Sequence, residues 1–433
     1  MNKSRRVKLL ANLAPVAMVS LFAASSVQAS NCSDYIPTGN FTLSLGVSGT
    51  CAGTLSATTA QAFFDKLTTT GIQSFSTVTY NGTQQASAFA NFNSLGMTLA
   101  FPYAVGQAGG NSNTLTLDIP GLGISQSFTG ATRDASQQLL QDYIKKQGNI
   151  LGRIMQYQAA NSATSPISGP GGMIQSVAAS DFNSNFTDSA TNIAAPASMA
   201  AAGSGGKSSN LAGVSLQYGS LDILNSKVKV VTVPLSYTIR NDIDPRRQLT
   251  FSLPLTEVDT NGAKSYQGGF GVSYRFPMSD SWTLTPGGKY SIVGSADMAT
   301  VSSLYTLSLT STYIWSMDSF DMAMGNMVGY NKTGKFSAGD YSFDPGITNT
   351  VFRNGLMLSQ PVVWGGKKLS VEYSLIDTRY TGSAMYVDNT QEFGISIGTN
   401  KSAFSARSYL RGGISYIHGK DTKGFNANIG YWF

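Results

Sequence analysis

The chain has 433 residues, of which 12% are charged, and it contains 46 glycines, two cysteines and one histidine. A single histidine excludes metal sites built from several histidines. The formal net charge of +6 falls to +2 (6 − 4) when the four basic residues among the first 29 are set aside, so the charge does not indicate a nucleic-acid partner.

Residues 1–29 have the three parts of a secretory signal peptide. Basic residues cluster within 3–8, a mostly apolar run covers about 9–24, and residues 27–29 (VQA) form a small-x-small cleavage pattern. The apolar run is shorter than a transmembrane helix needs. We therefore expect export of the chain and cleavage after Ala29.

Two cysteines, Cys32 and Cys51, follow the expected cleavage site closely. In an exported protein an even, closely spaced pair of cysteines predicts a disulfide. Such a bond closes a loop of about 20 residues and contributes roughly 3 kcal/mol to stability in the chain-entropy model.

Residues 30–132 are predicted to form a small exported β-rich region. Charged side chains are few in this segment, whereas threonine, serine, asparagine and glycine are abundant. Short runs at 74–80, 97–105 and 113–119 have strand character, and 57–67 has the character of a short helix.

Residues 133–160 are predicted to form one long amphipathic helix, in which Leu140, Ile144 and Leu151 recur at helical spacing. A helix of this length measures about 40 Å, which is enough to run through an object as thick as a bilayer. The following segment, 161–213, is rich in Gly, Ala, Ser and Pro, and this composition predicts a linker.

Residues 214–433 are predicted to form an all-β fold, a transmembrane antiparallel β-barrel of about 12 strands. Apolar and polar residues alternate along each run: Phe251 and Leu253 share one face, while Thr250 and Ser252 share the other. This alternation suits a wall between lipid and a wet lumen. The expected strands are 215–223, 230–239, 248–256, 269–276, 282–292, 303–315, 320–330, 349–359, 368–376, 392–398, 408–419 and 424–433.

The inward face of this predicted barrel carries a small set of charges. In an open pore their positive excess favours anions. Alternatively, the charges pair with each other or with a plug segment. The predicted lumen charges are Arg240, Arg275, Lys289, Arg353, Glu372, Glu392 and Arg411.

The last predicted strand has one apolar face, on which Ile429, Tyr431 and Phe433 lie. Aromatic residues at a strand end are typical of the boundary between lipid and water. An unpaired sheet edge in lipid leaves backbone groups without partners, so this strand must pair with the first one. We expect these three residues to serve barrel closure and terminal recognition.

Three residues do not fit a regular barrel wall. Pro234 and Pro254 fall in the middle of neighbouring strands, where proline removes a hydrogen bond of the ladder, so a bulge is expected at both. Asn326 faces lipid if the alternation is strict, so a register break or bulge is expected there too.

The sequence GFGVSYRFPMSDSWTLTPGGKYSIVGS (269–295) resembles the hairpins of autotransporter barrels, and the overall order of segments is similar to that family. The best match is its small group of solitary autotransporter-like barrels. The resemblance implies the Gram-negative outer membrane, contact with outer-membrane lipid, and insertion by the barrel-assembly machinery with periplasmic chaperones. It also implies a pore helix and an external N-terminal segment, although the long predicted linker 161–213 leaves the place of helix 133–160 open.

The sequence carries no recognisable catalytic motif: neither GxSxG nor HExxH occurs. His418, the sole histidine, is expected at the lipid boundary. We assign no catalytic, cofactor-binding or metal-binding residue and expect no cofactor, no enzymatic activity and no nucleic-acid partner.

Three functions remain open from the sequence alone. The first is a barrel that anchors or displays a small N-terminal segment without catalysis. The second is an outer-membrane diffusion channel that is plugged or gated by its N-terminal region. The third is a surface enzyme that uses carboxylates.

Overall fold

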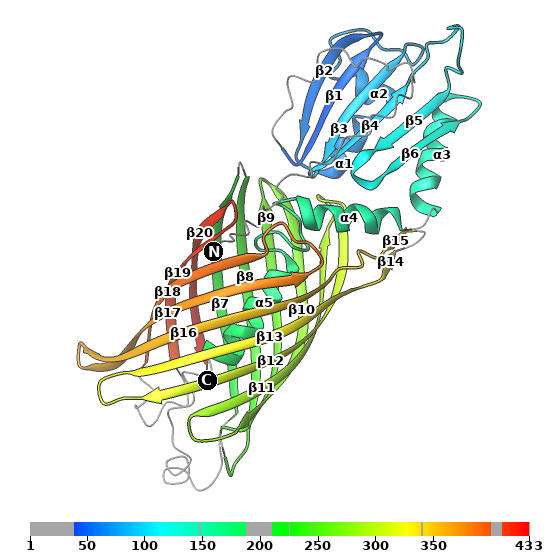
Figure 1. The fold of residues 1–433 in the computed structure, drawn as a ribbon. Helices are drawn as coiled ribbons and strands as arrows, with labels where there is room; N and C mark the ends of the chain where they lie inside the picture. Colours follow the sequence, from blue (N-terminus) through cyan, green and yellow to red (C-terminus); the bar gives the residue numbers. More distant parts are fainter. Residues whose placement is uncertain are drawn as a thin grey trace, which may run out of the picture.

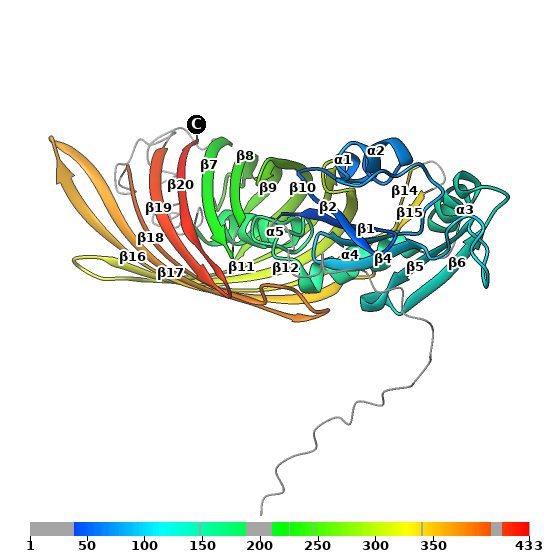
Figure 2. The same ribbon diagram turned by 90° about the horizontal axis from the view of Figure 1, so that it is seen from above.

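The computed structural model describes residues 39–146, 149–187, 210–224, 226–244, 246–338, 341–399 and 409–432. An N-terminal domain stands on one mouth of a closed β-barrel, and a helix lies inside the barrel (Figures 1 and 2). The expected signal peptide, 1–29, falls outside the described residues.

The N-terminal domain is built on one antiparallel sheet with the strand order β2-β1-β3-β4-β5-β6. Two short helices, α1 (Ala60–Asp65) and α2 (Thr69–Gln73), follow β2, and a 3₁₀ turn, η2 (Pro120–Leu122), follows β5. The strands are β1 (Phe41–Val47), β2 (Thr50–Ala57), β3 (Ala86–Phe92), β4 (Leu95–Phe101), β5 (Thr114–Ile119) and β6 (Ile124–Thr129).

One face of this sheet carries the core of the domain. The rings of Phe41, Phe63 and Phe92 pack together, with centroids 4.8–6.2 Å apart. All three side chains are buried. Aromatic contacts of this kind anchor α1 to β1 and β3.

The segment predicted as one helix over 133–160 forms two helices, α3 (Arg133–Lys146) and α4 (Ile150–Asn161). Asn149 interrupts the helical path, because its φ of 57° is left-handed. Leu140 and Tyr143 of α3 and Ile150 of α4 pack on the core of the N-terminal domain, whereas Met155 and Ala159 of α4 join a second buried cluster with residues of the barrel. Helix α4 therefore lies between the domain and the barrel (Figure 1). The prediction of a single long helix is therefore corrected.

The barrel is a closed antiparallel sheet of twelve strands, which confirms the predicted fold class. A small hairpin, β14 (Phe336–Ala338) and β15 (Tyr341–Phe343), lies in the connection between β13 and β16. The barrel strands are β7 (Leu211–Ile223), β8 (Ser226–Arg240), β9 (Gln248–Thr260), β10 (Ala263–Pro277), β11 (Trp282–Ser295), β12 (Thr300–Ser316), β13 (Asp321–Gly334), β16 (Thr348–Trp364), β17 (Lys367–Gly382), β18 (Asn389–Thr399), β19 (Tyr409–Gly419) and β20 (Thr422–Trp432).

The barrel has two distinct mouths. We call the end that carries the turns 261–262 and 296–299, beside the N-terminal domain, the domain mouth. The other end, where β7 begins and β20 ends, is the far mouth. These two strands pair along their length and close the sheet.

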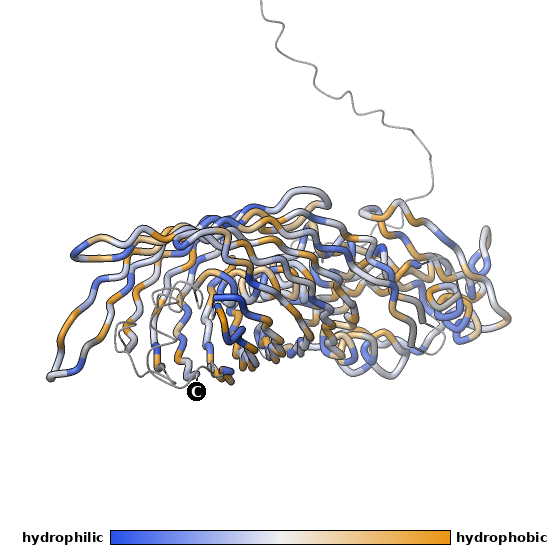
Figure 3. Tube along the Cα trace, turned by 90° about the horizontal axis from the view of Figure 1, so that it is seen from below, coloured by the Kyte–Doolittle hydropathy of each residue, from blue (hydrophilic) through white to orange (hydrophobic). Residues whose placement is uncertain are grey.

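The barrel wall is apolar on its outer face, as the alternation predicts. Leu255 and Phe270 are exposed on that face, whereas Thr256 and Ser265 are buried inside. Figure 3 shows hydrophobic and hydrophilic residues alternating along the strands. A wide exposed apolar wall of this kind is typical of a barrel surrounded by lipid.

Neither expected irregularity shifts the strand register. Pro234 lies directly opposite Pro254, and the ladder of β8 with β7 skips the two pairs of Val233 and Pro234 and resumes in the same register. Asn326 keeps a regular register between Ser311 and Asn354. The predicted bulges are therefore wrong. Each proline leaves a gap of two pairs in one ladder without a shift of register, and the wall accommodates the outward amide of Asn326.

Arg133 at the start of α3 ties two loops of the N-terminal domain together, the α2–β3 and the β4–β5 connections. Its guanidinium donates to the carbonyl oxygens of Ser112, Gln84 and Tyr103 at 2.7–3.0 Å and to the hydroxyl of Tyr80 at 3.3 Å. It also stacks over the ring of Phe101, 4.5 Å from the ring centroid. The side chain is buried, so its removal leaves several acceptors without a donor at once.

Replacing Arg133 by methionine is expected to lower the free energy of unfolding of the N-terminal domain by about 3 kcal/mol. Urea titration with pulse proteolysis measures this, with the barrel fragment as internal reference. The matched control is Arg153→Met on α4, an exposed arginine that donates to the carbonyl oxygen of Leu122. Equal stability losses in the two variants would refute the role of Arg133.

Candidate functional site

The barrel lumen holds a short helix that the sequence did not predict. Helix α5 (Met173–Phe182), continued by a π-helical turn, η3 (Asn183–Thr187), packs against the inner faces of β11, β12, β13 and β16. Part of the predicted linker 161–213 is therefore an ordered plug. A helix in a narrow lumen needs small residues, such as Ala178 and Ser180, and for this reason its composition is similar to that of a linker.

Two phenylalanines anchor the end of this plug in the wall. Phe182 and Phe186 are buried, with ring centroids 5.0 Å apart. They fill space over Gly325 of β13 and Gly355 of β16, where an added Cβ would approach the rings to 2.5–3.0 Å. Glycine at these two wall positions is thus a steric requirement for seating the plug.

A buried ion pair joins the plug to the wall. Lys289 Nζ of β11 lies 2.5 Å from Asp181 Oδ1 of α5 and donates to Ser180 Oγ at 3.1 Å. The lysine side chain is 3% exposed and the aspartate side chain 11% exposed. Both charges are therefore mostly removed from water and depend on each other.

Two further ion pairs link wall strands to each other. Arg353 Nη2 of β16 donates to Glu392 Oε1 of β18 at 2.9 Å, and its guanidinium lies 5.4 Å from the ring centroid of Phe182. Arg411 of β19 pairs with Glu372 of β17 at 2.5 Å. The first pair therefore also touches the plug.

The seven predicted lumen charges all occupy positions of the inward face of the barrel. The structure brings five of them into the three ion pairs just described. Arg275 donates to Gln248 Oε1 at 3.0 Å near the far mouth, and Arg240 ends β8 at the same mouth. The arrangement is one of paired charges around a plug.

The residues predicted for barrel closure lie on β20 where it meets β7. Ile429 and Tyr431 face outward, opposite Leu216 and Val214. Phe433 lies outside the described residues. Their role in terminal recognition stays a prediction.

The predicted disulfide stays a prediction as well. Cys51 lies in β2, and Cys32 falls outside the described residues. Among the residues that the structure describes, no group of His, Cys, Asp and Glu could hold a metal ion. In the same part of the chain, no helix is long and apolar enough to cross a membrane.

The N-terminal domain is seated on the domain mouth by direct contacts. The amide of Ala60 donates to the carbonyl of Asp297 at 2.7 Å, and Met298 joins the core of the domain. The side chain of Asn149 forms two hydrogen bonds with the backbone of Asp344, at 2.6 and 2.9 Å. These contacts place the helix break at Asn149 on the β15 side of the mouth.

A second set of contacts secures the segment between α4 and α5 at the same mouth. The amide of Tyr386 donates to the carbonyl of Ala159 at 2.9 Å, and its hydroxyl donates to Asp421 at 3.0 Å. Burial and the hydrogen bond to Asp421 raise the pKa of Tyr386. The β17–β18 connection thus holds the chain where it enters the lumen.

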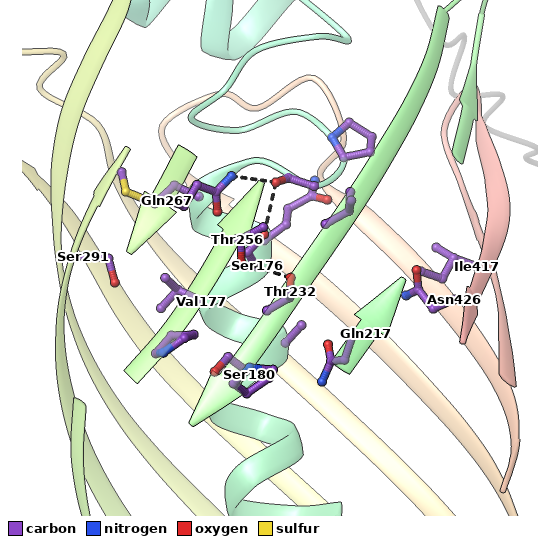
Figure 4. A pocket seen from close by; sticks show the side chains of 18 of the residues that line it. Ser176, Val177, Ser180, Gln217, Thr232, Thr256, Gln267, Ser291, Ile417 and Asn426 are labelled. Atoms are coloured by element: carbon purple, nitrogen blue, oxygen red, sulfur yellow. Dashed lines mark hydrogen bonds between the residues drawn. The ribbon is translucent and has the colours of Figure 1, made fainter. Parts of the chain in front are cut away.

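Beside α5 the lumen retains a cavity of about 130 Å³ (Figure 4). Polar side chains line much of it, including Ser176 and Ser180 of the plug. On the wall side lie Gln217, Thr232, Thr256, Gln267 and Asn426. The space suits a few water molecules.

The chain runs through the lumen from one mouth toward the other. At the domain mouth, Gln267 Nε2 donates to the carbonyl of Gly171 at 2.8 Å. Further along, Asn185 Nδ2 donates at 3.3 Å to Thr310 Oγ1, in the part of β12 closer to the far mouth. The next described element, β7, begins at the far mouth.

Sequence analysis missed the plug side of this site. Asp181, Phe182 and Phe186 were placed in a linker, although two phenylalanines within five residues after an acid are unusual in a solvated linker. This local signal, next to the apolar Met173, Ile174 and Val177, could have indicated a buried segment.

No protein-family model matches the chain, and no curated protein matches it. Among solved structures, the chain is similar to the β domain of the Bordetella autotransporter BrkA, with a TM-score of 0.43, 14% identity and coverage of 52% of this chain and 99% of that one. The chain is also similar to the translocator domain of the autotransporter NalP from Neisseria meningitidis, with a TM-score of 0.42, 13% identity and coverage of 60% of this chain and 96% of that one. For an outer membrane channel from Pseudomonas putida F1 the TM-score is 0.34, the identity is 13%, and the coverage is 52% of this chain and 94% of that one.

Replacing Lys289 by methionine is expected to lower the free energy of unfolding by about 3 kcal/mol, because Asp181 then stays buried without a cation. The double variant Lys289→Met/Asp181→Leu is expected to recover most of that loss. Urea unfolding in detergent micelles, followed by tryptophan fluorescence, measures both. A double variant as unstable as the single one would show that the ion pair does not seat α5.

Proposed function

We propose that this chain is an outer-membrane β-barrel of autotransporter type that anchors its N-terminal domain and displays it on the cell surface. The observation that carries the proposal is the path of the chain. The domain sits at one mouth, α5 occupies the lumen, and the first barrel strand begins at the opposite mouth.

This path gives the two mouths different roles. The segment with α5 runs through the lumen. The N-terminal domain and the far-mouth ends of β7 and β20 are therefore separated by the length of the barrel. We assign the far mouth to the periplasm, because insertion from that side leaves the ends of the first and last strands there. The domain mouth then faces the outside, and the predicted signal peptide accounts for export.

The proposed partners follow from the surfaces of the barrel. The apolar outer wall contacts outer-membrane lipid, and its assembly requires the barrel-assembly machinery and periplasmic chaperones. The paired charges of the lumen have structural roles in this proposal, so the chain is assigned no catalysis and no cofactor.

A second candidate is a diffusion channel that is plugged by α5. One observation favours it: the cavity beside α5 is lined by polar side chains, so displacement of the helix would leave a hydrophilic lumen. In this case the N-terminal domain regulates passage and is not the displayed product.

Display predicts that a tag in the exposed loop 105–111, inserted between Gln107 and Ala108, is removed by protease on intact cells. The matched control is the same tag in the far-mouth turn between Gly365 and Gly366, which is expected to resist until the outer membrane is opened. Immunoblots of shaved cells, with a periplasmic marker, measure both. The reverse pattern would overturn the orientation.

The channel candidate makes a separate prediction for two deletions. Removing residues 31–160 leaves α5 in place, so single-channel conductance in planar bilayers is expected to stay near that of the full chain. Removing 31–187 also removes the plug, and conductance is expected to rise severalfold. If both deletions behave alike, α5 is not the element that blocks the lumen.

A further inference from the structure

A row of polar side chains crosses the outward face of the barrel. It consists of Ser311 on β12, Asn326 on β13, Asn354 on β16, Asp377 on β17 and Gln391 on β18, each directly opposite the next. From Gln391 the same register leads toward the domain mouth through His418, Lys423, Asp222 and Lys227.

The row runs diagonally, because barrel strands tilt relative to the barrel axis. Lys227 is the second residue of β8 at the domain mouth, whereas Ser311 is only five residues from the far-mouth end of β12 (316 − 311 = 5). The row therefore crosses the apolar band of the wall. Large apolar residues flank it two positions away and are 42–55% exposed: Leu309, Val328, Phe352, Leu356, Leu375 and Phe393.

Three members of the row within the apolar band have partners in the chain itself. Ser311 Oγ accepts from Trp282 Nε1 at 2.9 Å. Asp377 accepts from Gln391 Nε2 at 3.0 Å and pairs with Arg379 Nε at 3.1 Å. The charged members nearer the domain mouth lie where water and lipid headgroups reach them.

Asn326 and Asn354 differ from these neighbours. Within the part of the chain that the structure describes, neither side-chain amide takes part in a hydrogen bond. The two lie opposite each other on β13 and β16, and the side chain of Asn354 is exposed. Hydrocarbon supplies no donor or acceptor, so two such amides in contact with lipid are costly.

We propose that the wall of β13 and β16 around Asn326 and Asn354 is an interface between two copies of this chain in the membrane. The inference rests on the proposed membrane-spanning barrel. An asparagine amide carries donors and an acceptor, so a patch of two asparagines is complementary to itself. Self-complementarity is what an interface with two-fold symmetry requires.

The diagonal course of the row fixes where the two copies meet. Two copies in the same orientation are related by a two-fold axis along the membrane normal. Where the two walls face each other, the polar row of one copy slopes in the opposite direction to the row of the other copy. The two rows therefore cross at one depth only. With the axis between β13 and β16, the crossing brings the amides of each copy against those of the other, while Leu356 and Val328 pack around them.

The test uses the full chain in lipid vesicles, with the dimer fraction measured by stepwise photobleaching over a range of protein-to-lipid ratios. The double variant Asn326→Leu/Asn354→Leu is expected to dimerise roughly tenfold more weakly than the parent chain. The matched control is Ser220→Leu, an exposed outward polar residue on β7 outside the row, which is expected to leave dimerisation unchanged.

A second measurement places the contact. A photo-crosslinking residue at Leu356 is expected to give a product of twice the chain mass, whereas the same residue at Tyr218 on β7 is expected to give none. Resistance to heat unfolding in detergent gels and insertion into vesicles show first that each variant forms the barrel, which tests the proposed function separately. An inserted parent chain that stays monomeric, an undiminished dimer in the double variant, or crosslinks only to lipid or to another protein overturns the interface.

Discussion

The structure depends on one constraint: backbone amides and carbonyls of a wall in lipid need partners within the protein. The chain meets it by pairing β20 with β7, which closes twelve strands without a free edge. Closure then fixes the rest, because it creates a lumen of limited width and two mouths on opposite sides. Elements that are not in the wall must fill the lumen or cover a mouth. Helix α5 does the first, and the N-terminal domain does the second.

The lumen shows how closure and charge are connected. Inward side chains are mostly small and polar, so a bare lumen would be wet, and charged residues there would need no partner. Once α5 occupies this space, the same charges lose water and must be matched. Lys289 meets Asp181 of the helix, whereas Arg353 and Arg411 find glutamates on neighbouring strands. The ion pair between Lys289 and Asp181 therefore distinguishes one seating of α5 from others, which is the best-supported use of a buried ion pair.

Sequence reasoning reached the barrel because its signal is local. The alternation around Phe251 and Phe270 is visible within a few residues. Because the same pattern recurs along the chain, it indicates the number of strands, the closing strand and the inward charges. It missed α5, because the glycines that make room for Phe182 and Phe186 lie more than 130 residues away, at Gly325 and Gly355. It also joined α3 and α4, because the break at Asn149 is secured by Asp344, 195 residues further along the chain.

The irregular residues of the wall carry a related lesson. A strict alternation treats an outward asparagine as an error to be removed by a bulge, yet the ladder through Asn326 is regular. A bulge would have turned one amide inward at the cost of shifting every later residue of β13 to the wrong face. Keeping the register preserves the seat of Phe186 on Gly325, which is the inward neighbour of Asn326. The plug thus constrains the wall from inside, and the amides stay on the lipid face, where the proposed interface between two copies supplies their partners.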